Sequence, residues 1–121
     1  MLDEFLYLRD IVEASEDIAE FVDGISREDF LGSKLIRWAI VQRLSVIGEG
    51  AAKISDELKS RHASVEWSQI IGARNILVHT YFKVDWEIIW DTVLNDIPVL
   101  RQQVQRILEE DFADRLGRTR N

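Results

Sequence analysis

The residues with the clearest chemical potential fall in one short stretch, Arg74-Asn75-Ile76-Leu77-Val78-His79-Thr80-Tyr81. The stretch places a guanidinium, an amide, an imidazole and a phenol in an otherwise apolar segment, and His79 is one of only two histidines in the chain. A fixed cation holds a phosphate, and an imidazole exchanges protons near pH 7. Together these groups could cleave a phosphodiester without a metal ion.

The spacing of these residues matters because periodicity predicts that the segment is helical. Asn75 and His79 are four residues apart and share one face of a helix. Arg74 and His79 are five residues apart, which separates them by about 140° around an ideal helix. Either the long arginine curls round the helix, or a second protomer completes the site across a twofold axis. Such a homodimer would supply two imidazoles, one as general base and one as general acid.

A purely structural role is the alternative for this cluster. His79 could satisfy the carbonyl groups at the end of its helix, and Arg74 could pair with Glu49 or Asp85. Structural ion pairs perturb arginines and histidines as readily as active sites do. The second histidine, His62, is expected to be solvated in a polar loop and to have no chemical role. The sequence contains no zinc-ligand spacing and no phosphate-binding glycine loop, so no metal and no cofactor are predicted.

Length and composition indicate one domain of 121 residues, with 46% hydrophobic residues and a single proline. The absence of cysteine excludes disulfides, thiolate nucleophiles and cysteine-based zinc sites. No signal-peptide pattern and no membrane-spanning apolar run is visible, so a soluble cytoplasmic protein is expected. The net charge of −7 argues against binding of nucleic acid through a broad basic face. A nucleic-acid substrate would therefore depend on a local cluster of positive residues.

Helical periodicity runs through most of the chain. A short helical turn should begin after Ser26, because Ser26 and Asp29 resemble a capping box with Asp in place of the usual Glu or Gln. Gly48 and Gly50 should permit close packing of a neighbouring helix, and Pro98 should kink the last helix. The periodicity predicts four main helices. They run over about residues 3–22, over about 33–60, from about 66 to a frayed end around 79–84, and from about 85 to 108.

The predicted fold is therefore all-α, an up-down helical bundle of four main helices plus the short helical turn. Residues 1–111 should form the helical domain. Residues 112–121 are rich in arginine and are expected to be a basic, disordered tail.

Four stretches of the chain carry a more specific pattern. They are Tyr7-Leu8-Arg9-Asp10-Ile11, then Ile47 to Lys53, then Trp67 to Tyr81, and finally Tyr81 to Asp85 with Ile89-Trp90 and Asn95 to Pro98. In this order, over about residues 3–110, the chain resembles the HEPN domains, and within them the HepT toxins of HepT–MntA toxin–antitoxin systems. The third stretch has the family's pattern of Arg, four residues, His, one residue, Tyr. Gly50 departs from the family, in which alanine is usual at that position.

The resemblance implies a dimeric α-helical bundle and a metal-independent RNase whose catalytic residues correspond to Arg74 and His79. It also implies an MNT-type nucleotidyltransferase antitoxin that neutralises the toxin by transferring AMP to Tyr81, as in a type VII-like toxin–antitoxin pair. RNA, and not DNA, is then the expected substrate. Asn75 would orient His79 or donate to a phosphate oxygen, and Glu49 would orient Arg74. The alternative is a non-catalytic HEPN interaction or nucleotide-binding module that partners a nucleotidyltransferase, which the acidic charge favours and the intact Arg and His oppose.

Overall fold

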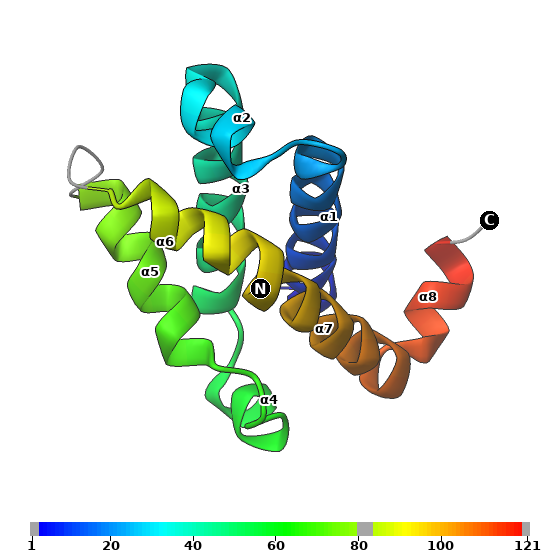
Figure 1. The fold of residues 1–121 in the computed structure, drawn as a ribbon. Coiled ribbons are helices and arrows are strands. Elements are labelled where there is room, and N and C mark those ends of the chain that lie inside the picture. Colours follow the sequence, from blue (N-terminus) through cyan, green and yellow to red (C-terminus); the bar gives the residue numbers. More distant parts are fainter. Residues whose placement is uncertain (1–2, 80–83, 120–121) are drawn as a thin grey trace.

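The computed structural model describes residues 3–79 and 84–119, with the backbone alone for residues 74–79 and 118–119. Over these residues the chain is all-α, and none of the described helices is long and apolar enough to cross a membrane. The predicted helical bundle is confirmed (Figure 1). Its elements are α1 (Glu4–Val22), α2 (Arg27–Gly32), α3 (Lys34–Ala52), α4 (Asp56–Arg61), α5 (Trp67–His79), α6 (Trp86–Asp91), the π-helical turn η2 (Thr92–Asp96), α7 (Ile97–Asp111) and α8 (Ala113–Thr119).

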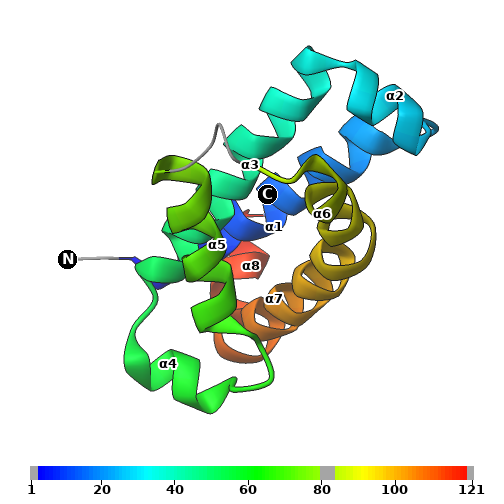
Figure 2. The same ribbon diagram turned by 60° about the vertical axis from the view of Figure 1, so that its left-hand side comes forward.

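The helices α1 and α3 form the centre of the bundle. α1 packs against α3 and α7, and α3 also packs against α5 (Figures 1 and 2). Each of these central helices directs one apolar face inward, as expected for amphipathic helices around a shared core. The core includes the fully buried side chains of Leu8, Ile11, Ile18, Ile40, Ile47, Val104 and Leu108.

Gly50 lies where α3 and α1 approach closely. A Cβ atom at this position would lie 3.1 Å from the Cγ1 atom of Ile11 and 3.1 Å from the backbone oxygen of Tyr7. Both separations are shorter than ordinary van der Waals contact, so α1 lies directly against the bare backbone of α3. The predicted role of a glycine in close helix packing is confirmed at this position.

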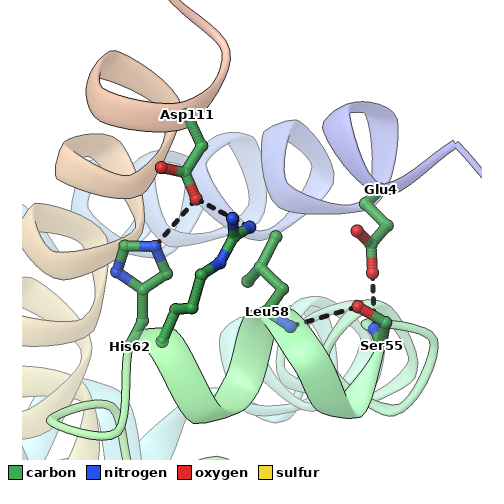
Figure 3. Close-up of polar contacts among 6 residues, drawn as sticks. Glu4, Ser55, Leu58, His62 and Asp111 are labelled. Atoms are coloured by element: carbon green, nitrogen blue, oxygen red, sulfur yellow. Dashed lines mark hydrogen bonds and ion pairs between the residues drawn. The ribbon is translucent and has the colours of Figure 1, made fainter.

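The predicted continuous helix over residues 33–60 is wrong, because the chain leaves α3 after Ala52 and begins α4 after Ser55. Ser55 caps the new helix: its Oγ atom accepts a hydrogen bond from the Leu58 N–H at 3.2 Å. Its own N–H donates to the carboxylate of Glu4 on α1 (Figure 3). A serine that satisfies free N–H groups stabilises the start of a helix, so it favours an interruption here.

The last long helical segment begins as predicted at Asp85, whose Oδ1 atom accepts hydrogen bonds from the N–H groups of Glu87 and Ile88. The disturbance expected at Pro98 takes the form of η2, a π-helical turn that ends at Asp96. Proline has no N–H to donate to the preceding turn, and a widened π turn is one way in which a helix accommodates such a defect.

The chain beyond Asp111 differs from the expected disordered tail, since residues 113–119 form α8. Arg115 binds the carboxylate of Asp3 with both terminal nitrogens, at 2.9 and 3.4 Å, and its guanidinium lies 4.3 Å from the centre of the Phe5 ring. Phe112 also contacts Phe5, with 5.9 Å between ring centres. The hydrogen bond from Arg115 holds the pKa of Asp3 below its ordinary value. These contacts fasten α8 to the start of α1.

Candidate functional site

The predicted site residues Arg74, Asn75 and His79 lie on one helix, α5. The described part of α5 begins at Trp67, as predicted, and reaches His79; the expected fraying around His79 to Val84 falls largely outside the described residues. Asn75 lies one turn before His79 on the helical backbone, and Arg74 is offset from His79 by about 140°. The backbone of α5 therefore preserves the angular relation that the spacing predicts.

Tyr81, the predicted acceptor of AMP, lies outside the described residues. In the sequence it lies two positions after His79.

Glu49, the predicted supporting carboxylate, lies on α3, three residues before that helix ends. Its side chain is exposed. The helices α3 and α5 pack together and run in opposite directions (Figure 1). The structure thus brings the helix that bears Glu49 next to the helix that bears Arg74, Asn75 and His79.

The N-terminal end of α5 is held by Trp67. Its side chain is buried, and its indole Nε1–H donates a hydrogen bond to the backbone oxygen of His62 at 3.1 Å. Farther along α5, Ile70 and Ile71 are half-buried against the core. Trp67 is the most deeply buried of the α5 side chains that the structure describes, so it anchors the start of the helix.

His62 is not the solvated loop residue that the sequence suggests. It ends α4, its side chain is only 15% exposed, and its Nε2 atom lies 2.9 Å from the Oδ2 atom of Asp111 (Figure 3). Arg61 donates to the same oxygen at 3.2 Å. No local sequence pattern could predict the contact between His62 and Asp111, because the two residues are 49 positions apart.

The described residues contain no group of three or more His, Cys, Asp or Glu side chains arranged to hold a metal ion. The backbone positions of Arg74, Asn75 and His79 thus lie on α5, and Glu49 lies on the neighbouring helix α3.

Known proteins share this chain's sequence over most of its length. A protein of Caldanaerobacter subterraneus subsp. tengcongensis, named "Putative RNase", is 40% identical over 105 residues, which cover 87% of this chain and 94% of the relative. A Thermococcus cleftensis protein named "Probable ribonuclease HepT" is 39% identical over 101 residues, which cover 84% of this chain and 92% of that protein. A "Putative RNase" of Methanocaldococcus jannaschii is 34% identical over 99 residues, which cover 82% of this chain and 91% of that protein. No solved structure gives a significant match.

The family described as "Ribonuclease HepT-like" matches residues 11–107, a span that runs from within α1 to within α7 and includes all of α5. Because this match covers most of the chain, and the relatives align over nearly their whole length, the chain belongs to the HepT-like ribonuclease family.

Proposed function

We propose that this protein is the toxin of a type VII-like toxin–antitoxin pair, an endoribonuclease that cleaves RNA without a metal ion through Arg74 and His79. The observation that carries the proposal is the Arg-to-His pattern on the helical backbone of α5, in a chain that belongs to the HepT-like ribonuclease family. The names of the relatives add support, since each contains RNase or ribonuclease.

The chemistry follows from the residue types. His79 accepts the proton of a ribose 2′-OH, the 2′-oxygen attacks phosphorus, and the bond from phosphorus to the 5′-oxygen breaks. A second imidazole delivers a proton to the leaving 5′-oxygen, which is the usual division between general base and general acid. Arg74 binds the phosphate and stabilises the extra charge of the transition state. Asn75, one turn from His79, orients the imidazole or donates to a phosphate oxygen, and Glu49 orients Arg74.

The second imidazole comes from a second copy of the chain in this proposal. The angular offset on α5 makes it difficult for one protomer to direct Arg74 and His79 at the same phosphate. Exposed apolar side chains on two helices, Leu35 of α3 and Ile88 of α6, supply surface that a second protomer would cover. A twofold dimer that places two α5 helices near its axis would join both pairs of residues in one cleft.

Control of the toxin is assigned to Tyr81. An MNT-type nucleotidyltransferase partner would transfer AMP to its hydroxyl, two positions beyond the end of α5. The added phosphate carries negative charge into the neighbourhood of the groups that hold RNA phosphate, so it opposes substrate binding by repulsion and by bulk.

RNA cleavage in the presence of EDTA tests the catalytic assignment. His79→Ala and Arg74→Ala should each lose roughly 100-fold or more in rate, the usual scale for a general acid–base group or a transition-state charge donor. Arg106→Ala is the matched control, because Arg106 is an exposed arginine on α7. Products that end in a 2′,3′-cyclic phosphate would support attack by the 2′-OH. A folded His79→Ala chain that cleaves RNA as fast as the parent chain would show that His79 is not a catalytic residue.

A non-catalytic interaction or nucleotide-binding module is the second candidate, and the net charge of −7 favours it. The same assay separates the two functions. A parent chain that binds its nucleotidyltransferase partner but cleaves no RNA at any protein concentration would replace the proposed toxin with this module.

A further inference from the structure

Among the described residues, the main helix neighbour of α5 is α3. α5 packs chiefly against α3, whereas α1 packs against both α3 and α7 (Figures 1 and 2). Crossing angles between two packed helices scatter by about 15–20°, so one helix neighbour alone does not set a precise direction. An attachment at the start of α5 therefore adds to the packing on α3 in setting where its residues lie.

The attachment at the start of α5 passes through His62. The indole of Trp67 is buried and donates to the backbone oxygen of His62 at 3.1 Å. The N–H of Trp67 donates to the backbone oxygen of Val65 at 2.9 Å. The first residue of α5 is thus bound to the segment that follows α4, so the position of that segment helps to set the position of α5.

The segment after α4 is fastened in turn to α7. The His62 Nε2 atom lies 2.9 Å from the Oδ2 atom of Asp111, the last residue of α7, and Arg61 reaches the same oxygen at 3.2 Å (Figure 3). Gln103 of α7 donates to the backbone oxygen of Ser64 at 3.2 Å. The side chains of His62 and Asp111 are 15% and 23% exposed, and hydrogen bonds that are partly shielded from water are stronger than fully exposed ones.

We infer that His62 is a positioning residue for the proposed ribonuclease site: its bond to Asp111 ties the start of α5 to α7 and so fixes the helix that carries Arg74 and His79. The catalytic part of this inference rests on the proposed function, whereas the fixing of α5 does not. Catalytic groups must be placed accurately, since a displacement of about 1 Å lowers a rate by roughly 100-fold.

The role of His62 is separable from the stability of the bundle. α4 keeps three other attachments when His62 is replaced: the bond from the N–H of Ser55 to Glu4, the fully buried side chain of Leu58, and the ion pair from Arg61 to Asp111. A change at His62 should therefore loosen α5 while α1, α3 and α7 remain packed.

The first test compares two substitutions of His62. His62→Ala removes the bond to Asp111, and we expect kcat for RNA cleavage to fall by roughly 10- to 100-fold with little change in KM. His62→Gln should restore most of kcat, because the glutamine amide can donate to Asp111 from nearly the same place as Nε2. The matched control is Arg101→Ala, which breaks the ion pair between Arg101 of α7 and Glu16 of α1 at 3.3 Å, remote from α5. This control should keep the parent kcat.

The second test follows hydrogen exchange of backbone amides in the same variants. In His62→Ala the amides of α5 should exchange faster than in the parent chain, and those of α1 and α7 should be unchanged. Unchanged exchange in α5, or faster exchange in every helix, would overturn the inference. An equal loss of kcat in His62→Gln would overturn it as well. If the parent chain cleaves no RNA, the proposed function fails, and the exchange of the α5 amides alone decides whether His62 fixes this helix.

Discussion

Replacing Gly50 with alanine should destabilise the bundle, although alanine is the better helix former. Alanine is favoured over glycine by about 1 kcal/mol inside a helix. At Gly50, however, the new methyl group would meet the backbone oxygen of Tyr7 and the Cγ1 atom of Ile11, each at 3.1 Å. The oxygen belongs to the backbone of α1, so relief requires that the two central helices separate.

The size of the effect follows from these two opposing contributions. Forcing an extra methylene-sized group into a packed interior costs about 1–3 kcal/mol. After the helix preference of about 1 kcal/mol is subtracted, Gly50→Ala should lower the free energy of unfolding by about 0–2 kcal/mol. Gly72→Ala is the matched control, because Gly72 lies inside α5 and no described atom comes within 4 Å of a Cβ placed there. It should raise the free energy of unfolding by about 1 kcal/mol.

Thermal and urea unfolding, followed by far-UV circular dichroism, measures the difference between the two variants. Since helix preference cancels between them, the difference should be about 1–3 kcal/mol. For a chain of this length this corresponds to about 4–12 °C in Tm. Protein concentrations must be equal, because association would make Tm depend on concentration. The outcome shows whether α1 can yield at this position. A Gly50→Ala chain as stable as Gly72→Ala would refute the close-packing argument.

Three further predictions concern assembly, control and pH. Light scattering at micromolar concentration should give about twice the chain mass of 14.1 kDa; a monomer that cleaves RNA would contradict the shared site. Tyr81→Phe should keep most of the RNase activity yet escape the nucleotidyltransferase partner, and intact mass spectrometry with partner and ATP should show added AMP on the parent chain only. The bond from Arg115 lowers the pKa of Asp3, so its stabilisation is present above the ordinary pKa of about 4 and is lost as pH falls through the lower, folded-state pKa. The difference in Tm between the parent and Arg115→Ala should therefore shrink on acidification, and a difference that grows would contradict this account.

Helices were predictable from the sequence where their signals are local. Asp85 and Ser26 cap the helices that follow them through neighbouring residues, so their roles are visible in short stretches. The break after α3 is different, because Ile54 and Leu58 are both buried and continue the apolar periodicity of α3 across it. The bond from Ser55 to Glu4 supports the break, and its partners are 51 positions apart.

The same distinction applies to the candidate site. Arg74, Asn75 and His79 belong to one helix, so their relation follows from their spacing alone. The connection between His62 and Asp111 depends on how α4 and α7 pack, and no local pattern contains that information. The helix α8 was not predicted for a similar reason. The arginine-rich composition of this segment is typical of a disordered tail, whereas the residues that hold Arg115 in place, Asp3 and Phe5, lie at the opposite end of the chain.

The bond between Arg115 and Asp3 also has a kinetic meaning. It joins positions 112 apart in the sequence, so it closes a loop that contains nearly the whole bundle. The entropy cost of such a loop is offset only after α1 and α7 have already packed, and contacts of long sequence range form slowly. During refolding, α8 should be the last element to dock. α5 would then be assembled on α3, through contacts of much shorter range, before the two ends of the bundle meet.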